Sequence, residues 1–356
     1  MISNVLGIAP QAVEDDAMEL LRHGCERNEV LLLAARLSEV QRQFRPEMGT
    51  LERELLDLES AAASGNLAQR AAAHLLRAPG KRIRPLCVFL AASYGVPRRE
   101  DVAALGRAVE LTHAATLLHD DVIDDAALRR HSPTARVVFG NSASVLGGDH
   151  LLVEALRTVR TTGSAVILDG LLAAIDSMID AEAVQLERRG TFTVSRETYD
   201  RVVRGKTAAL FRWSLASGAA IAGCSQAEVE VLGALGEDLG FAFQLVDDVL
   251  DLSAVSDESG KVPLSDVREG KLTWPLLCAC EAQPSLIMTI RAAAAEPDPD
   301  FSSILSAVRA TGALEATEAR AWRFAQRATR ALDSLPPGVT TEALRAVVHA
   351  AVRRGC

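Results

Sequence analysis

The sequence predicts an all-α protein built as one helical domain with a central bundle. Aromatic residues make up only 4% of the 356 residues, whereas alanine and leucine are abundant, and this composition favours helices. Apolar residues recur with a helical period through most of the chain. Alternating β-branched runs, which would indicate strands, are short and isolated. Helices that each carry one apolar face must pack against one another, so a bundle is expected.

The helical pattern divides the chain into successive segments. Residues 12–44 predict two amphipathic helices separated near Gly24, residues 48–64 a third that ends at Gly65, and residues 66–80 a fourth that ends at Pro79-Gly80. Further helices are expected at 86–95, 101–126, 144–160, 164–187, 195–222, 226–252, 272–282, 301–309, 313–334 and 340–353. Residues 253–271 are rich in Gly, Ser, Pro and Asp, and loops of this kind often carry function. We expect residues 1–50 to be an N-terminal helical extension of a main domain that spans residues 51–356.

Charge and cysteine usage narrow the class of protein. The formal net charge of -9 argues against general nucleic-acid binding, although it does not exclude a local basic site. The six cysteines are scattered and form no C-x-x-C pair, so reduced thiols are expected rather than a disulfide framework. The N-terminus has no basic segment followed by an apolar stretch, and no run approaches the ~18 apolar residues of a spanning helix. We therefore expect a cytoplasmic protein.

Two helices carry the same acidic motif, D-D-x-x-D, within otherwise apolar sequence. The first lies in "LLHDDVIDD" (117–125) and the second in "FQLVDDVLD" (243–251). Positions i, i+3, i+4 and i+7 share one face of a helix. The residues concerned are Asp120, Asp121 and Asp124 in the first motif, and Gln244, Asp247, Asp248 and Asp251 in the second.

A single motif of this kind is at least as easily explained by a solvated helix face. Two copies inside apolar helices favour a binding function. Carboxylates at i and i+4 repel by roughly 0.2–0.5 kcal/mol per pair, and a bound cation would offset that cost. Mg²⁺ takes one or two carboxylates and completes its coordination with water and phosphate oxygens. Facing aspartate clusters would therefore hold a polyphosphate through metal ions.

Basic residues accompany the acidic motifs. Each of them alone is an ordinary surface cation, but as a set they indicate two anionic groups, because arginine and lysine are the side chains that hold phosphate. They are Lys81, Arg82 and Arg84 after Gly80, Arg129 and Arg130 after the first motif, Lys206 beside Thr207, and Lys261 and Lys271 in the long loop.

The motifs resemble those of the trans-isoprenyl (polyprenyl) diphosphate synthases. Six segments follow the family's order: "GKRIRP", "LTHAATLLHDDVIDD", "FGNSASVLGGDHLL", "AEAVQL", "KTAALF" and "FQLVDDVLD". Their amino-acid sequences are most similar to those of the long-chain, octaprenyl-type branch. The resemblance implies a helical bundle of the isoprenoid synthase type with a central active-site cavity, residues 51–356 as the catalytic domain, and a homodimer. It also implies head-to-tail 1'-4 condensation of isopentenyl diphosphate with an allylic diphosphate, farnesyl or geranyl.

The resemblance also assigns roles to individual residues. Mg²⁺, three ions per site, would bind the allylic diphosphate through Asp120, Asp121, Asp124, Asp247 and Asp248, with Asp251 completing the second motif. The same diphosphate would contact Arg129, Lys206, Lys261 and Lys271. Isopentenyl diphosphate would contact Lys81, Arg84, His113 and Arg130, in a turn shaped by Gly80, while Thr207 and Gln244 would line the reacting centre. A peripheral membrane contact would serve product release.

The sequence departs from the family pattern at three places. His131 stands where a glycine usually follows the arginine pair, Leu264-Ser265 precede Asp266 in place of Gly-Asp, and Trp274 replaces a smaller residue before Pro275. Glu182 and Gln185 match the family's E-x-x-Q; a cavity position and a buried polar pair serving the bundle are equally expected for them. None of these departures removes a residue on which the chemistry depends.

Product length should depend on the helix that carries the first motif. One turn before Asp120 stand Ala115 and Thr116, and Thr112 lies one turn further back. Short-chain relatives place a bulky aromatic residue at the 115 or 116 position, so small residues predict a deeper pocket and a long product, octaprenyl or a neighbour. Small residues that serve only helix packing are the alternative.

Three other functions remain open at this stage. A short-chain farnesyl or geranylgeranyl diphosphate synthase would share all of these motifs. A class I terpene cyclase shares the metal chemistry but usually carries one D-D-x-x-D and an aromatic-rich pocket. A noncatalytic partner subunit shares the fold but typically loses the aspartates. The duplicated motif and the scarcity of aromatic residues favour a chain-elongating enzyme.

Overall fold

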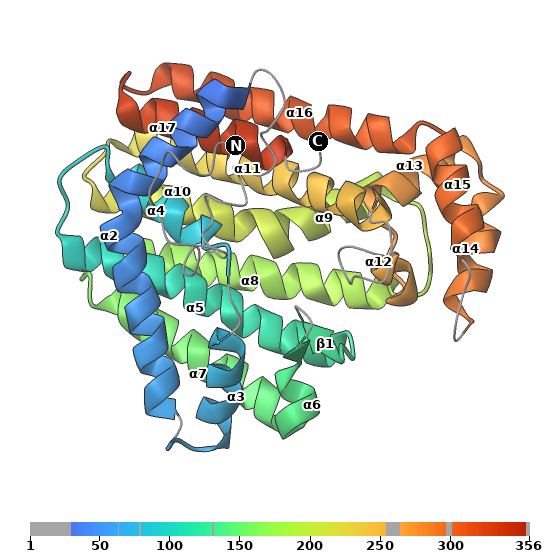
Figure 1. The fold of residues 1–356 in the computed structure, drawn as a ribbon, viewed down its shortest axis with the longest axis horizontal. Helices are drawn as coiled ribbons and strands as arrows, with labels where there is room; N and C mark the ends of the chain where they lie inside the picture. Colours follow the sequence, from blue (N-terminus) through green and yellow to red (C-terminus); the bar gives the residue numbers. More distant parts are fainter. Residues whose placement is uncertain are drawn as a thin grey trace, which may run out of the picture.

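The computed structural model describes residues 30–62, 64–77, 80–129, 132–253, 264–296 and 301–353. The predicted all-α class is confirmed, since helices make up most of the described chain (Figure 1). The two-residue strands β1 (Leu128–Arg129) and β2 (Ser132–Pro133) pair antiparallel directly after the first acidic motif. Within the described residues, no helix combines the length and the apolar character needed to cross a membrane.

The helices follow one another along the chain with short connections. Their bounds are α2 Val30–Ala62, α3 Leu67–Leu76, α4 Ile83–Ala92, α5 Arg99–Ile123, α6 Ala135–Phe139, α7 Asn141–Arg160, α8 Ala165–Arg188, α9 Arg196–Val203, the π-helix η1 Arg204–Ala208, α10 Ala209–Ile221, α11 Gln226–Ser253, α12 Ser265–Arg268, α13 Trp274–Ala282, α14 Leu286–Ala294, α15 Ser302–Ala310, α16 Ala313–Ala331, the 3₁₀ turn η2 Leu332–Ser334, and α17 Val339–Val352.

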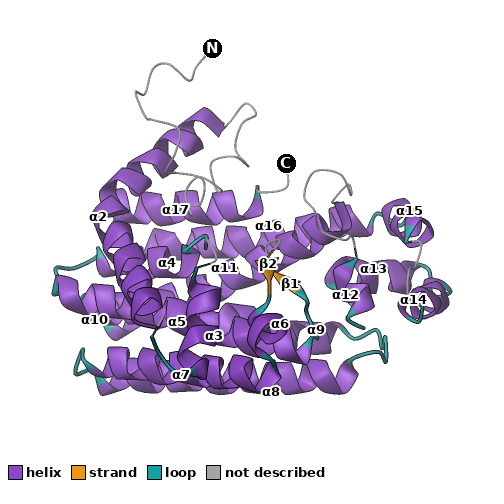
Figure 2. Cartoon of the chain, turned by 60° about the horizontal axis from the view of Figure 1, so that its bottom comes forward, coloured by secondary structure: helices purple, strands orange, loops and turns teal. Residues whose placement is uncertain are grey.

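The core of the bundle is formed by α4, α5, α10 and α11. Helix α10 packs against α4, α5, α8 and α11, while α7 covers α5 and α16 covers α11 (Figures 1 and 2). Side chains such as Phe89, Leu118 and Phe211 are almost completely shielded from solvent. These long helices hold both acidic motifs on rigid, buried elements, which fixes the direction of each aspartate.

Helix α2 is continuous where the sequence pattern predicted separate helices on either side of Pro46. The helix runs through this proline because its apolar face continues across it: Leu37, Phe44, Leu51 and Leu55 are all buried in the core, and tertiary packing of such a face dominates helix stability. The domain boundary predicted at residue 50 lies within α2. Residues 1–29 of the predicted extension lie outside the described residues.

Residues 195–222, predicted as one helix, form three successive elements: α9, the π-helix η1 and α10. Such π-turns are rare and frequently mark functional sites, and this one carries Lys206 and Thr207. It lies close against α8, because a Cβ at Gly205 would stand 2.3 Å from the carbonyl oxygen of Ser177. A glycine is therefore required to bring the Lys206 side chain up to α8. Helix α14 was missing from the sequence prediction.

Candidate active site

A cavity of about 870 Å³ opens among α4, α5, α7, α8, η1, α10 and α11. Its volume lies in the upper part of the range of about 300–1,000 Å³ that small-molecule sites occupy. One part of its wall is apolar and consists of Leu117, Ile123, Leu152, Ile175, Met178, Ile179, Ala183, Leu186, Phe211 and Phe243. The other part is polar and includes Gly80, Lys81, Arg84, His113, Asp120, Arg129, Lys206, Thr207, Gln244 and Asp247. Residues from both acidic motifs thus meet at one cavity.

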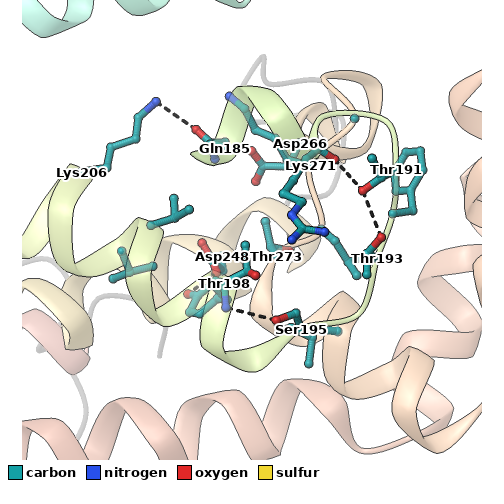
Figure 3. Close-up of a pocket in the computed structure, with 18 of the residues that line it drawn as sticks. Gln185, Thr191, Thr193, Ser195, Thr198, Lys206, Asp248, Asp266, Lys271 and Thr273 are labelled. Atoms are coloured by element: carbon teal, nitrogen blue, oxygen red, sulfur yellow. Dashed lines mark hydrogen bonds between the residues drawn. The ribbon is translucent and has the colours of Figure 1, made fainter. Parts of the chain in front are cut away.

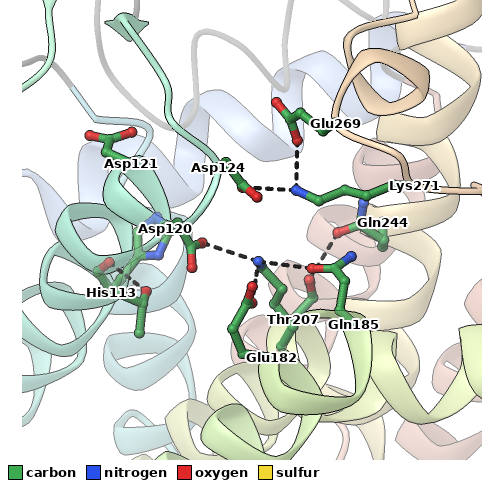
Figure 4. Close-up of polar contacts among 12 residues, drawn as sticks. His113, Asp120, Asp121, Asp124, Glu182, Gln185, Thr207, Gln244, Glu269 and Lys271 are labelled. Carbon is green, nitrogen blue, oxygen red and sulfur yellow. Dashed lines mark hydrogen bonds and ion pairs between the residues drawn. The ribbon is translucent and has the colours of Figure 1, made fainter. Parts of the chain in front are cut away.

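The first motif does not point all of its aspartates the same way (Figure 4). Asp120 and Asp124 point toward Lys206 and Lys271, whereas Asp121 points away from them. The Asp121 side chain is fully shielded from solvent, and Arg129 donates to its Oδ1 from Nε at 2.9 Å and lies within 2.8 Å through a second nitrogen. Burial raises the pKa of Asp121, and Arg129 offsets this in part.

Lys206 connects the first motif to α8. Its ammonium lies 3.3 Å from Asp120 Oδ2, donates to Glu182 and donates to Gln185 Oε1 at 3.2 Å. Burial raises the pKa of Asp120, and the Lys206 charge opposes the shift. Conversely, Asp120 and Glu182 outweigh the effect of burial and raise the pKa of Lys206. Lys206 therefore stays protonated as the counter-ion of two carboxylates.

Lys271 has the corresponding role at Asp124. Its ammonium donates to Asp124 Oδ2 at 2.8 Å and to Glu269 at 2.6 Å. Its pKa is raised, because Glu269 and Asp124 outweigh the lowering effect of burial. Arg189 lies 3.8 Å from the other oxygen of Asp124 and donates to the carbonyl of Ile123 at the end of α5. The loop before α13 is thus tied to the first motif by charge.

The second motif is divided in the same way, but its buried member has different neighbours. Asp247 lines the main cavity. Asp248 is 2% exposed and accepts hydrogen bonds from Tyr199 OH at 2.7 Å, Gln244 Nε2 at 2.9 Å and the Trp274 amide at 3.3 Å. Burial raises the pKa of Asp248 to about 6 despite these donors. Gln244 Oε1 in turn accepts from Thr207 at 2.8 Å.

A smaller cavity of about 200 Å³ lies behind this network, beside the main one (Figure 3). Lys206, Gln244 and Asp248 contribute to its wall together with the hydroxyls of Thr191, Thr193, Ser195, Thr198 and Thr273. Asp266, on the same wall, has a pKa raised well above its ordinary value by burial and by the nearby carboxylates of Asp251 and Asp248. Carboxyl groups of the second motif and of Asp266 therefore lie close together on this side of the site.

Cations also line the main cavity. The Arg84 guanidinium lies 4.7 Å from the centre of the Phe211 ring, and its buried Nε has no hydrogen-bond partner among the described residues. Lys81 and His113 line the same wall. Arg82 also lines the cavity, but it is already paired with Glu52 at 2.8 Å and with buried Glu110. An unpartnered buried donor costs free energy, so an anion that accepts from Arg84 is favoured here.

The donor set of the acidic motifs fits Mg²⁺. Carboxylate oxygens are the ligands that this ion prefers, and it needs only one or two of them besides water and phosphate oxygens. In the described part of the chain, no three His, Cys, Asp or Glu side chains are grouped so that they could hold a metal ion by themselves. The carboxylates of Asp120 and Asp124 are paired with the ammonium groups of Lys206 and Lys271.

The structure distinguishes among the residues that the sequence singled out. It brings together Gly80, Lys81, Arg84, His113, Asp120, Arg129, Lys206, Thr207, Gln244 and Asp247 at the main cavity, with Asp124 and Lys271 joined at its edge. Thr116 lines the cavity, whereas Ala115 and Thr112 are fully buried and are not part of its wall. Asp251 is half-buried near Asp266. Arg130, His131 and Lys261 lie outside the described residues.

Sequence reasoning missed several contributors and left others open. Glu182 and Gln185 do face the site, since both accept from Lys206. Tyr199 and Glu269 were not identified at all. Tyr199 lies on α9 and its partner Asp248 on α11, so no spacing along one helix could reveal this contact.

Comparison with known proteins places these features in a family. The family model described as polyprenyl synthetase matches residues 66–308. The octaprenyl diphosphate synthase of Escherichia coli is 37% identical over 303 residues, which cover 83% of this chain and 93% of that protein. The nonaprenyl diphosphate synthase of Mycobacterium tuberculosis is 36% identical over 288 residues, covering 79% and 85%.

Solved structures agree with the sequence relatives. The polyprenyl synthase from Caulobacter crescentus, crystallised with calcium and isoprenyl diphosphate, superposes with a TM-score of 0.81 at 33% identity and covers 89% of this chain and 97% of that chain. A decaprenyl diphosphate synthase from Rhodobacter capsulatus gives a TM-score of 0.80 at 32% identity, covering 89% and 98%.

Proposed function

The chain belongs to the polyprenyl synthetase family, and on that premise we propose that it condenses isopentenyl diphosphate with an allylic diphosphate to give a long-chain all-trans polyprenyl diphosphate. The observation that carries this proposal is the meeting of both acidic motifs, a separate cationic wall and a deep apolar pocket at one cavity. An enzyme that joins two diphosphates needs two anionic sites and room for a hydrocarbon chain, and this cavity offers all three.

The acidic side would bind the allylic diphosphate. Asp120, Asp124 and Asp247 would hold Mg²⁺, three ions per site, with Asp251 as a further ligand of the second motif. Bound there, Mg²⁺ would stabilise negative charge on the departing diphosphate. Lys206 and Lys271 lie against these carboxylates and would turn their ammoniums onto the same diphosphate. We assign Arg129 and Lys261 to that diphosphate as well.

The buried aspartates would act by position rather than by direct metal contact. Asp121 fixes Arg129 at the cavity wall. Asp248 orients Gln244, whose carbonyl accepts from Thr207, and this pair lies beside Lys206 on the cavity wall. Fixed dipoles of this kind are most effective where charge develops in a site that excludes water.

The cationic wall would bind isopentenyl diphosphate. Arg84, Lys81 and His113 line it, and we assign Arg130 to the same substrate. The apolar wall would shield the reacting carbons from water, since Phe211, Phe243 and Leu117 close it near the polar groups. Holding both substrates in one orientation can supply up to ~7–11 kcal/mol of the barrier reduction.

Product length should be set where the apolar pocket passes Thr116. This side chain lines the cavity, so Thr116→Phe should shorten the product by several isoprene units while leaving the first condensation intact. Ala115→Phe is the matched comparison, because Ala115 is fully buried in the core and is not part of the cavity wall. Any change in product length caused by Ala115→Phe should be accompanied by a loss of folding stability, because overpacking a core typically costs about 1–3 kcal/mol. Chromatography of the dephosphorylated products measures both lengths.

One assay separates this function from the alternatives. The purified chain is incubated with labelled isopentenyl diphosphate, farnesyl or geranyl diphosphate and Mg²⁺. Linear products longer than geranylgeranyl are expected. Products that stop at farnesyl or geranylgeranyl would indicate a short-chain synthase, and a cyclic hydrocarbon formed without isopentenyl diphosphate would indicate a terpene cyclase. A chain that is inert alone would contradict the proposal and support a noncatalytic subunit.

A further inference from the structure

The side chain of Arg320 on α16 lines neither cavity, but it packs against two residues that hold the second acidic motif. Helix α16 runs along α11 and reaches α13 (Figure 1). The Arg320 guanidinium lies 3.4 Å from the centre of the Trp274 ring and 5.9 Å from that of the Tyr199 ring, and the two ring centres are 5.1 Å apart. The side chain is 12% exposed and donates to Asp200 at 2.6 Å. Arg320 therefore holds both rings from the side of α16.

Both rings belong to residues that donate to Asp248. The Tyr199 hydroxyl donates at 2.7 Å and the Trp274 amide at 3.3 Å, and both bonds end at Oδ2. Trp274 is the first residue of α13, so a contact that fixes its ring also fixes the start of that helix and the direction of the amide. Two of the three donors that hold this buried carboxylate therefore depend on rings that pack against Arg320.

The contact needs both a planar cation and a large ring. A guanidinium stacks on an aromatic face, whereas the ammonium of lysine is a compact point charge, and cation–π attraction is strongest where water is excluded. The Nη1 of Arg320 is buried without a hydrogen-bond partner among the described residues, so the rings and Asp200 hold this side chain. Trp274 is a position at which the sequence departs from the family pattern, and a smaller side chain there would remove the nearer aromatic face.

We propose that Arg320 is a positioning residue for the condensation and that it acts through the two aromatic residues and Asp248. The proposal rests on the prenyl-elongating function stated above and deepens it. Asp248 accepts from Gln244, and the carbonyl of Gln244 accepts from Thr207 at the main cavity. Helix α16 lies beyond residues 66–308, which the family model matches, so a part of the chain outside that match sets the geometry of the site.

Arg327 on the same helix offers a matched control. Arg320 and Arg327 stand seven residues apart, both lie over the Phe324 ring, at 5.5 and 4.6 Å, and each pairs with an aspartate. Among the described contacts, the one that separates them is the stack of Arg320 on Trp274. Arg320→Met and Arg327→Met each remove a stacked, ion-paired arginine from α16, so both should lower the folding stability, but the kcat should fall in Arg320→Met alone.

Steady-state kinetics test the effect on the reaction. Arg320→Met should lower kcat by roughly 10-fold, because loosening one hydrogen bond of the network costs about that factor. The KM of both substrates should change little, since no substrate-binding side chain is lost. Arg320→Lys keeps a cation for Asp200 but lacks the planar stack, so its kcat should fall nearly as far. Equal losses of kcat in Arg320→Met and Arg327→Met, or a wild-type kcat in Arg320→Lys, would overturn the proposal.

A double variant separates positioning from packing. In Asp248→Asn the network lacks its central carboxylate, so adding Arg320→Met should cause little further loss of kcat. It should still cost about as much folding stability as it does in the wild type, because the contacts of Arg320 with the two rings remain to be lost. Kinetics and urea denaturation of the four proteins give both quantities. The same loss of kcat in both backgrounds would show that Arg320 does not act through Asp248.

Hydrogen exchange at the Trp274 amide tests the first link without any turnover. In Arg320→Met this amide should exchange roughly 10-fold faster than in the wild type, because its bond to Asp248 is weakened, while Arg327→Met should leave the rate unchanged. Unchanged exchange in Arg320→Met would overturn the proposal. A wild type that transfers no prenyl group would instead count against the proposed function, and the exchange result would still decide whether Arg320 fixes Trp274.

Discussion

The two acidic motifs share the sequence D-D-x-x-D but have different electrostatic surroundings. In both, the first aspartate lines the cavity and the second is buried. Asp121 on α5 is buried against the Arg129 cation, whereas Asp248 on α11 is buried against the neutral donors of Tyr199, Gln244 and the Trp274 amide. The α5 motif also has Lys206 and Lys271 against its outer carboxylates.

This difference shows how one motif can be used in two ways. The α5 motif carries its own counter-ions, so its carboxylates are already balanced when no metal is bound, and a metal-bound diphosphate has lysines to receive it. The α11 motif lies near Asp266, and its carboxylates raise the pKa of that group. It therefore offers negative charge that a metal ion can neutralise. We infer that both motifs contribute metal ligands and that the lysines paired with the α5 motif position the diphosphate.

The largest expected effect comes from removing a cavity-facing carboxylate from either motif. Asp120→Asn and Asp247→Asn should each lower kcat by roughly 1,000-fold or more, because each removes part of a charge stabilisation worth several kcal/mol. Asp125→Asn is the control, since Asp125 follows the same motif but its side chain is 81% exposed and pairs with Arg136. Steady-state kinetics at saturating Mg²⁺ give these values. Equal losses in all three variants would remove the distinction between cavity-facing and outer carboxylates.

The buried members of the motifs should differ in their effect on stability. Arg129→Met leaves the Asp121 charge buried without its cation, and breaking such a pair costs about 3–5 kcal/mol. Because Asp121 Oδ2 is already buried without a partner, little remains to compensate. Urea denaturation of the metal-free protein measures the loss. Recovery of most of the stability in the double variant Arg129→Met/Asp121→Asn would confirm the cause, and its failure would show that Arg129 acts through another contact.

The α11 motif should make the metal-free protein sensitive to pH. The pKa of Asp248 is raised to about 6 by burial, so the folded state holds this proton more tightly than the unfolded chain does. The free energy of unfolding should therefore fall as pH rises from about 4 to 6, by up to ~3 kcal/mol from this group. In Asp248→Asn that contribution is absent, so its stability relative to the wild type should improve over the same interval. A constant difference between the two proteins would contradict the assigned environment.

The smallest expected effect is the loss of one neutral donor. Tyr199→Phe removes the hydroxyl that donates to Asp248, while Gln244 and the Trp274 amide remain. The expected cost is about 1–2 kcal/mol, which is less than that of Arg129→Met. Thermal unfolding of Tyr199→Phe and Arg129→Met under the same conditions shows which substitution costs more stability. The reverse order would mean that the α11 motif, rather than α5, carries the more strongly coupled buried carboxylate.

Much of the fold and the identity of the site could be predicted from periodicity and spacing. The helices that carry the motifs are long and rich in apolar residues, so α5 and α11 lie close to their expected positions. The inward orientation of Asp121 and Asp248 was not predicted, because the shared-face argument grouped adjacent residues together. Neighbours on a helix project about 100° apart, so Asp120 and Asp124 can share a face that Asp121 does not.

The remaining features depend on contacts between distant elements. The π-helix at Lys206 arises where Gly205 packs against α8, which no local pattern in "RGKTA" indicates. Tyr199 and Trp274 reach the second motif from α9 and α13. Ala115 and Thr116 are equally small and adjacent in sequence, but only Thr116 lines the cavity, and this depends on the rotation of α5 in the bundle.

The most direct test is a crystal structure of the protein with Mn²⁺, as an anomalous substitute for Mg²⁺, and a non-ionisable thio-analogue of farnesyl diphosphate. We predict anomalous peaks between the carboxylates of Asp120 and Asp124 on α5 and that of Asp247 on α11. The diphosphate should bridge them, and the Lys206 and Lys271 ammoniums should have moved from the aspartates onto it. A diphosphate bound with no metal between α5 and α11 would contradict the account.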